Sequence, residues 1–288
     1  MAPHTIVELA ERLDQVRSLS HVFIPDIGQG FTSLDICSAC LAVSKRLRVG
    51  SGVVRILEYE PSVLARRMFT LQELSGSRFV LGIGTGPVGS DPGLTIRSMI
   101  DGLHSTRESF TKFAGGLARV RVPETFIATL RKGIAKTVAG ECDGILLNFC
   151  PPEHVRDVVR SIGELRQGLI VSCYLKIFYA RELATAYRMM MKEFAHYDQN
   201  PSYHKMFMSI GVAEEIARMK TALKTGENVS PSEKLLEISL ASPSRTMLTA
   251  YVNKFREAGV DLPCLYPYFE PGEDEAYKMS KVMEIVQL

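Results

Sequence analysis

The chain has 288 residues, of which 46% are hydrophobic and 23% charged, so it can form one large domain or two modest ones. Its formal net charge of +2 argues against a nucleic-acid binder and against a protein that binds acidic membranes. No apolar run approaches the roughly 20 residues that span a bilayer, and the N-terminus lacks the pattern of a signal peptide. We therefore expect neither a nucleic acid nor a membrane as a partner.

Short apolar strands alternate with amphipathic helices along the chain. The predicted strands are HVFIPD (21–26), LRVGSGVV (47–54), FVLGIG (79–84), ETFIATL (124–130), GILLNFC (144–150), LIVSCYLKIF (169–178) and PCLYPYF (263–269). The predicted helices cover 32–46, 60–76, 95–114, 131–141, 152–166 and 273–286, with a long helical block over 181–258. The strands are continuously apolar, as in sheets that are buried on both faces. This alternation predicts an α/β fold, a (β/α)8 barrel first and a doubly wound sheet second.

The start of the chain leaves little room for a strand. Thr5 and Glu8 have the spacing of a capping box, which predicts a helix that begins almost at once. Only residues 1–4 precede that box, too few for the first strand of a barrel. A barrel that lacks one strand exposes unpaired edges on two neighbours. We expect a stub strand, another segment that fills the gap, or a true start upstream of Met1.

The six cysteines are scattered through a chain too large to need disulfides, which favours a reducing cytoplasm. Cys37 and Cys40 form a C-x-x-C inside the apolar helical run SLDICSACLAV, away from a strand end. Their position favours packing over a redox or metal role. No group of His and Cys has the spacing of a zinc site, so we predict no metal.

The segment RFVLGIGTGPVGS contains Gly84, Gly86 and Gly89 in the spacing G-x-G-x-x-G of dinucleotide-binding proteins. In those proteins the motif follows the first strand, and an acidic residue ends the second strand about 20 positions later. Here earlier strands precede the glycines, and Asp101 lies in a stretch of loop and helix. The context therefore argues against a dinucleotide site.

Two segments carry a resemblance to a known family. RLRVGSGVV, and above all PSVLARRMFTLQELSGSRFVLGIGTG, are similar to the third-strand and fourth-strand segments of the bacterial luciferase-like superfamily. FIATLRKGIAKTVAGECDGILLNF and SPSRTMLTAYVNKFREAGVD resemble later parts of the same superfamily. The resemblance weakens over 87–120 and 181–240. Its members are flavin- and deazaflavin-dependent oxidoreductases, including methylenetetrahydromethanopterin reductase and luciferase-type monooxygenases.

The resemblance implies a luciferase-like TIM barrel, here with its first strand truncated or missing. It implies one barrel domain over 1–288, with the helical insertion 181–258 before the last strand, and a homodimer. It also implies that coenzyme F420, a deazaflavin, or FMN binds at the C-terminal ends of the strands, where barrel active sites lie.

Family members that use F420 often have a non-proline cis peptide in the bulge that ends the third strand, and the matching bond is Gly52–Val53. The glycines of LGIGTG would let the backbone approach a flat ring, or they merely relieve crowding. Arg131 and Lys132 open a helix and could hold a phosphate, or they are surface charges. The predicted cofactor-binding residues are Ser51, Gly52, Val53, Gly84, Thr85, Gly86, Ala128, Thr129, Leu130, Arg131 and Lys132.

Asp26 and Glu60 are the predicted catalytic residues. Asp26 matches the family's aspartate after the second strand, where Ile27 replaces a frequent histidine. Asp26 could instead cap a helix or bond a loop, and Glu60 could only cap the helix that starts at Pro61. The first hypothesis is F420-dependent hydride transfer with a small organic substrate. The alternatives are an FMN-dependent monooxygenase, a family member that has lost catalysis and serves as a binding or structural dimer subunit, and an NAD-dependent dehydrogenase.

Overall fold

The protein is described by a computed structural model that covers residues 1–26, 30–86, 92–115, 120–227 and 229–287. The chain divides into two compact units. The first contains residues 1–128, 138–145 and 275–287, and the second contains residues 129–137 and 146–274. The single domain expected from the sequence stays a prediction.

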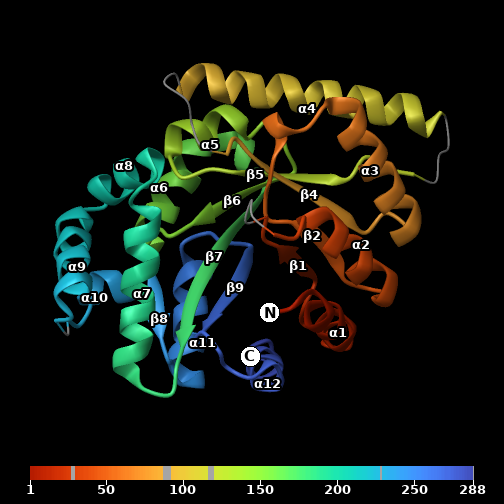
Figure 1. The fold of residues 1–288 in the computed structure, drawn as a ribbon. Coiled ribbons are helices and arrows are strands. Elements are labelled where there is room, and N and C mark those ends of the chain that lie inside the picture. The colour runs from red at the N-terminus through yellow and green to blue at the C-terminus, as the bar shows by residue number, and fades with distance from the viewer. Residues whose placement is uncertain (27–29, 87–91, 116–119, 228, 288) are drawn as a thin grey trace. The chain divides into compact units, whose positions relative to one another are not determined.

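The first unit holds most of the N-terminal half of the chain (Figure 1). Its strands are β1 (His21–Ile24), β2 (Arg48–Ser51), β3 (Val54–Arg55), β4 (Phe79–Gly84) and β5 (Glu124–Ala128). Its helices are α1 (Pro3–Leu13), α2 (Ser33–Val43), α3 (Pro61–Ser75), α4 (Pro92–Ala114) and α12 (Glu275–Ile285), with a 3-10 turn at Ile56–Glu58. These bounds agree closely with the predictions, except that the strand expected over 47–54 is broken into β2 and β3.

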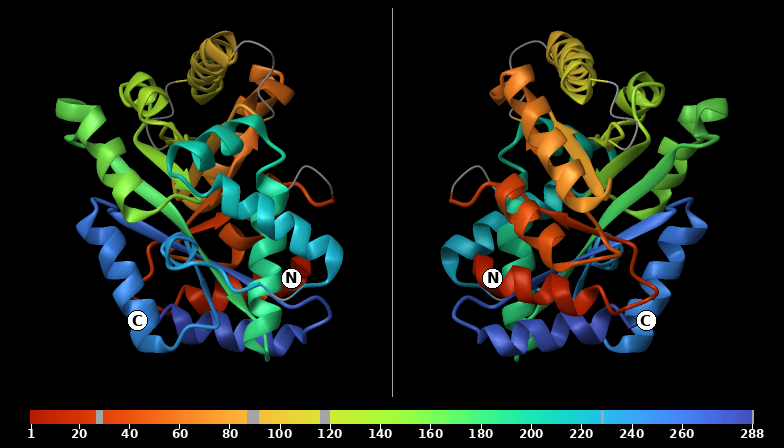
Figure 2. Two further views of the ribbon diagram at one scale, coloured as in Figure 1. Left: turned by 90° about the vertical axis from the view of Figure 1, so that its left-hand side faces the viewer. Right: turned by 90° about the vertical axis from the view of Figure 1, so that its right-hand side faces the viewer.

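The second unit holds the later strands, and β6 and α5 have residues in both units. The strands are β6 (Gly144–Asn148), β7 (Ile170–Tyr179), β8 (Ser239–Ala241) and β9 (Leu262–Phe269). The helices are α5 (Lys132–Val138), α6 (Pro152–Ile162), α7 (Leu183–Tyr197), α8 (Pro201–Ser209), α9 (Ala213–Thr225), α10 (Glu233–Leu236) and α11 (Arg245–Glu257). Helices α7 and α9 lie side by side (Figure 2). The short strand β8, which pairs with β7, interrupts the helical block expected over 181–258.

The parallel strands of the first unit follow one another in chain order, β1-β2-β4-β5, with β3 also paired to β4. A dinucleotide-binding sheet reverses its strand order beside its first strand, so this order differs from that of the doubly wound dinucleotide-binding fold. Gly89, the last glycine of the predicted G-x-G-x-x-G motif, lies outside the described residues.

The sheet of the first unit is curled. The rings of Phe23 on β1 and Phe126 on β5 lie 5.4 Å apart, although β2 and β4 separate these two strands. In a flat sheet three strand spacings would separate them by about 14 Å. The sheet therefore bends so that β1 and β5 approach across a concave face, as the predicted barrel fold requires.

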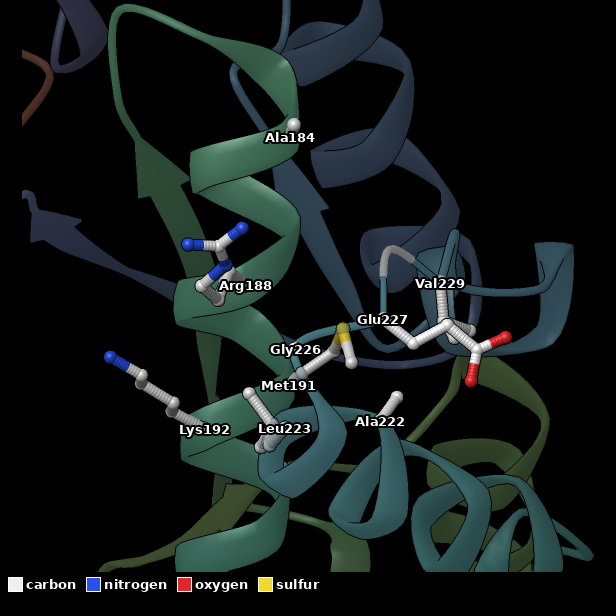
Figure 3. Close-up of a pocket in the computed structure, with 9 residues that line it drawn as sticks. All are labelled: Ala184, Arg188, Met191, Lys192, Ala222, Leu223, Gly226, Glu227 and Val229. Carbon is white, nitrogen blue, oxygen red and sulfur yellow. The ribbon is translucent and has the colours of Figure 1, made fainter.

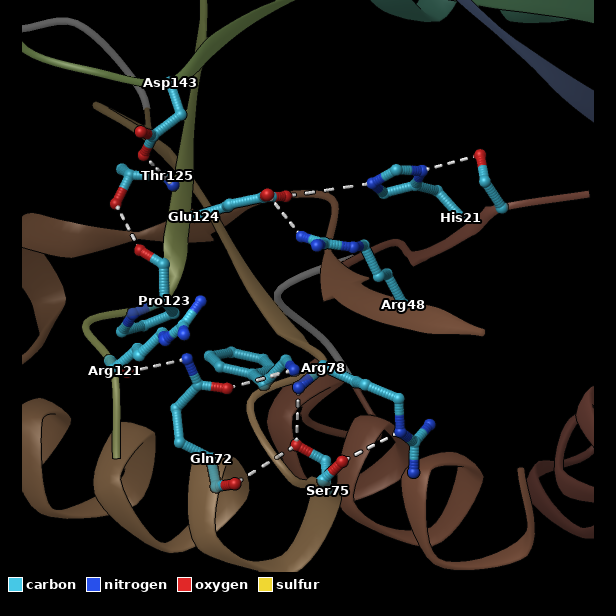
Figure 4. A network of polar contacts seen from close by, with 12 residues as sticks. His21, Arg48, Gln72, Ser75, Arg78, Arg121, Pro123, Glu124, Thr125 and Asp143 are labelled. Carbon is cyan, nitrogen blue, oxygen red and sulfur yellow. Dashed lines mark hydrogen bonds and ion pairs between the residues drawn. The ribbon is translucent and has the colours of Figure 1, made fainter. Parts of the chain in front are cut away.

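A polar cluster lies on this concave face where the strands begin (Figure 4). Glu124 of β5 forms an ion pair with Arg48 of β2, and its Oε2 lies 3.9 Å from Nε2 of His21 on β1. The nearby His21, and then Arg48, lower the pKa of Glu124 against the opposing effect of burial. The cluster thus joins the starts of three strands at the N-terminal end, the end that stabilises barrels rather than carrying catalysis.

Arg78, in the SGSRF segment just before β4, lies where two helices end (Figure 4). Its guanidinium donates to the carbonyl oxygens of Leu41 and Ser44 at the end of α2, and of Leu47 just before β2, at distances of 2.8–3.1 Å. It also donates to the carbonyl oxygen of Ser75 at the end of α3, 2.8 Å away. A cation at two helix C-termini satisfies carbonyls that no helical N–H can reach.

The N-terminal helix starts differently from the prediction. Helix α1 begins at Pro3 after Ala2, so the capping box expected from Thr5 and Glu8 is wrong. The cap comes instead from α12, where Oε2 of Glu275 accepts a hydrogen bond of 3.2 Å from the backbone N–H of Ala2. No strand occurs within residues 1–20, all of which the structure describes, so the first strand of the unit is β1.

Cys37 and Cys40 are fully buried on α2. Burial raises the pKa of Cys37 well above its usual value and that of Cys40 to about 11. Such thiols stay protonated and unreactive near neutral pH. The packing role expected for this C-x-x-C is therefore supported.

We expect Arg78→Met to lower the free energy of unfolding by about 2–4 kcal/mol, because buried carbonyls at two helix ends lose their donors. Arg78→Lys should recover only part of this loss, because one ammonium cannot reach both helix ends. Urea unfolding followed by circular dichroism measures both. Arg66→Met, an exposed position on α3, is the control. A loss no larger than that of the control would contradict the role of Arg78.

Candidate functional site

A bulge lies between β2 and β3. Gly50 pairs with Val80 and Val54 with Ile83, so three residues, 51–53, face only two on β4. The peptide bond Gly52–Val53 inside the bulge is cis, as the family resemblance predicts. Ser51, which is fully buried, donates from Oγ to the carbonyl oxygen of Gly82 at 2.9 Å and accepts from its N–H at 3.0 Å. One side chain thus satisfies both backbone groups that the bulge leaves without a strand partner.

The glycines of β4 make room for this bulge. A Cβ on Gly82 would overlap the carbonyl oxygen of Ser51, and a Cβ on Gly84 would lie 2.9 Å from Cγ2 of Val53. The structure therefore shows the crowding that was the simpler explanation for these glycines. Contact between Gly84 and a cofactor stays a prediction.

The C-terminal end of the concave face carries mostly small side chains. Arg55 is the register partner of Gly84, and a Cβ on Gly84 would lie 3.7 Å from Cβ of Ala128. Since register partners of parallel strands point to the same side, Arg55, Gly84 and Ala128 share this face with Val53. Gly86 follows with φ +71°, a conformation that favours glycine. Most of the first-unit residues predicted to bind the cofactor therefore lie close together at this end of the sheet.

The two predicted catalytic carboxylates bond to helix N-termini. Oδ2 of Asp26 accepts hydrogen bonds from Oγ and N–H of Ser33 in the first turn of α2, at 2.8 and 3.4 Å. Glu60 caps α3 by accepting from the N–H of Val63 at 2.9 Å. Both observed roles are the alternatives that the sequence left open, and the catalytic roles stay predictions. Ile27 lies outside the described residues.

The predicted cofactor residues after β5 belong to the second unit. The N–H of Thr129 donates to the carbonyl oxygen of Leu146 at 3.1 Å, and the carbonyl oxygen of Leu130 contacts Nε2 of His154 at 2.8 Å. Arg131 is half-buried and Lys132 is exposed at the start of α5. Their phosphate-binding role stays a prediction.

The second unit contains a buried polar cluster that sequence reasoning missed. Lys176 of β7 is 1% exposed, and its Nζ lies 3.2 Å from Oε1 of Glu193 on α7. It also donates to the hydroxyls of Tyr197, 3.4 Å away, and Tyr268. The rings around Nζ, with centroids at 4.4–4.8 Å, are those of Phe149, Tyr197, Tyr266 and Tyr268.

Burial lowers the pKa of Lys176 to about 8, against the opposing effect of Glu193. Burial also raises the pKa of Tyr268. Because the amine is enclosed by rings and paired with a carboxylate, it attaches α7 to the sheet and is closed to a substrate. The one signal in the sequence was a lysine inside the apolar run LIVSCYLKIF, which alone does not identify its partners.

A hollow of about 250 Å³ lies between α7 and α9 (Figure 3). Met191, Ala222 and Leu223 form its apolar lining, whereas the charged ends of Lys192 and Glu227 point away from each other. Binding sites for small molecules usually contain a few polar groups that converge. We therefore do not assign the functional site to this hollow.

Among the residues that the structure describes, no helix is both long and apolar enough to cross a membrane. Within the same ranges, no three His, Cys, Asp or Glu side chains gather closely enough to hold a metal ion.

Residues 1–94 match the family described as luciferase-like monooxygenase. The predicted family resemblance is confirmed. The chain is also similar to a curated relative, 4-hydroxyprotoasukamycin monooxygenase of Streptomyces nodosus subsp. asukaensis, with 42% identity over 48 residues. That alignment spans only 17% of this chain and 13% of the relative.

Two solved structures are similar over nearly the whole chain. An F420-dependent secondary alcohol dehydrogenase, in complex with an F420-acetone adduct, has a TM-score of 0.74 at 13% identity, covering 100% of this chain and 96% of that one. The oxygenating constituent of 3,6-diketocamphane monooxygenase from Pseudomonas putida, in complex with FMN, has a TM-score of 0.60 at 12% identity. That match covers 99% of this chain and 91% of the other. At these identities the likeness shows the fold, which is the luciferase-like barrel type expected from the sequence.

We expect Gly82→Ala to lower the free energy of unfolding by more than about 3 kcal/mol, because the added methyl overlaps the backbone of the bulge. Gly133→Ala is the matched control, since nothing lies within 4 Å of a Cβ at that position on α5. Thermal and urea unfolding measure both variants. Equal stabilities for the two would show that the bulge does not require glycine on β4.

Lys176 should make stability depend on pH. Its folded pKa of about 8 lies below the unfolded value of 10.5, so between these values the unfolded chain binds more protons and stability rises with pH. The free energy of unfolding of the wild type, minus that of Lys176→Met, should rise by about 2 kcal/mol from pH 7.5 to 9.5. Tyrosine titration opposes this rise only at higher pH. Lys192→Met, exposed on α7, should give a flat difference. A flat difference for Lys176 as well would refute its lowered pKa.

Proposed function

We propose that the protein is an oxidoreductase that binds a flavin-type cofactor at the C-terminal end of the concave face of the first unit. The cofactor is most simply F420, and the reaction is hydride transfer to or from a small organic substrate. The observation that carries this proposal is the bulge between β2 and β3, which packs on the glycines of β4. The family match over residues 1–94 and the likeness to an F420-dependent alcohol dehydrogenase support it.

The residues present fit a flat ring. Val53, Gly84 and Ala128 offer a surface with no side chain larger than valine, and Arg55 lies at its end. When bound, the cofactor supplies the redox chemistry through its own ring. The chain's contribution is to hold the ring in position, keep water from one side of it and orient the substrate on the other. Asp26, at the end of the FIPD segment, is the proposed proton carrier of the first unit.

Two alternatives have their own support. An FMN-dependent monooxygenase is favoured by the likeness to an FMN-containing monooxygenase and by the short match to a monooxygenase relative. A family member without catalysis, acting as a binding or structural dimer subunit, is favoured by the use of Asp26 and Glu60 at helix N-termini. A homodimer in the cytoplasm remains part of the proposal, and light scattering of the purified protein tests the dimer.

Titration with F420 and with FMN, followed by cofactor fluorescence, tests the proposal. We expect micromolar binding of one of them, and hydride transfer or oxygen consumption then separates the two enzymatic alternatives. Ala128→Leu should weaken binding of that cofactor by at least about tenfold, because the larger side chain occupies the ring's place. Ala217→Leu, exposed on α9, is the control. Binding of neither cofactor by the wild type would leave the non-catalytic alternative.

A further inference from the structure

Arg55 is a charged side chain on the face proposed for the cofactor. It ends β3, it pairs in register with Gly84, and it therefore points to the same side as Gly84 and Ala128. Two other arginines of the first unit have structural roles, since Arg48 pairs with Glu124 and Arg78 donates to helix ends. Arg55 lies at the opposite end of the strands from both.

The backbone after β4 fixes the position of the Arg55 stem. A Cβ on Gly86 would lie 2.9 Å from Cδ and 3.2 Å from Cγ of Arg55, so the stem lies directly on this glycine. Gly86 has φ +71°, so glycine is favoured there by conformation as well as by space. Contacts with its aliphatic part thus hold the arginine at the end of the face, and these contacts do not involve its guanidinium.

The guanidinium has an exchangeable partner. Its Nη1 donates to Oε1 of Glu58 at 3.0 Å, and the side chains are 31% and 59% exposed. Ion pairs exposed to this degree contribute at most about 1 kcal/mol to stability. A guanidinium has five N–H donors, and the contact with Glu58 uses one of them. A phosphate can therefore bind in place of Glu58, or beside it, with little loss.

We propose that Arg55 binds the phosphate group of the cofactor, while the ring lies on the small residues nearby. FMN carries a phosphate monoester and F420 a phosphodiester, so the same side chain serves either cofactor. This inference rests on the proposed function. It differs from the sequence prediction, which gives the phosphate to Arg131 and Lys132. Those two residues belong to the second unit, at the start of a seven-residue helix.

The test separates the ring from the phosphate. Dissociation constants are measured for FMN and for riboflavin, which has the same ring without phosphate. If F420 is what binds, they are measured for F420 and for its phosphate-free ribityl deazaflavin. The wild type should prefer the phosphorylated form. Arg55→Met should weaken that form roughly 10- to 100-fold and leave the phosphate-free form within about twofold, so that the preference disappears. Arg55→Lys should retain part of the preference.

Controls and further measurements guard against a folding defect. Arg66→Met should leave both constants unchanged, and Glu58→Gln should leave the phosphorylated form unchanged or tighter. Raising the salt concentration should weaken the phosphorylated form selectively in the wild type and not in Arg55→Met. Equal weakening of both forms by Arg55→Met, a preference that survives it, or its loss in Arg131→Met alone would overturn the assignment. A wild type that binds no ring at all would instead refute the proposed function.

Discussion

The contact between Ser51 and Gly82 is the constraint on which the C-terminal end of the first sheet depends. The bulge displaces β3 from β2 by one residue, and the Ser51 hydroxyl then replaces the strand partner that Gly82 would otherwise have. A hydroxyl both donates and accepts, so it satisfies the carbonyl and the N–H together. The contact exists only because Gly82 has no Cβ. After the bulge, Val53 packs against Gly84 and the stem of Arg55 packs against Gly86, at the C-terminal end of the concave face.

Much of this arrangement was predictable because it is local. Continuous apolar runs gave the strands to within a few residues, and Pro61 with Gly76 bounded α3 as expected. The sequence predicted one strand over 47–54, because a hydrophobic pattern does not indicate a bulge. The family resemblance supplied the bulge and the bond Gly52–Val53, whereas the residues alone gave only two glycines in an apolar strand.

The features that were missed or mistaken depend on residues far apart in the chain. The cap of α1 is supplied by Glu275, so a local capping box was the wrong explanation for Thr5 and Glu8. Likewise, Lys176 is neutralised by Glu193 and surrounded by rings from three other segments. From a single sequence, a buried lysine is not expected, because burying its charge costs free energy. The partners that offset this cost lie far away in the chain and cannot be recognised from the sequence.

The positions of charge in the first unit also bear on what kind of chemistry it can support. Two of its carboxylates, Asp26 and Glu60, accept hydrogen bonds at helix N-termini. For Glu60, hydrogen bonds from Ser62 and Val63 lower the pKa and make the carboxylate a weaker base. Such a group is poorly suited to a reaction that the protein must drive by acid and base alone. It is adequate where a bound ring performs the electron transfer and the protein chiefly positions it. A concave face of small residues, with acids turned to the helices and a cation at its end, is consistent with that division of work.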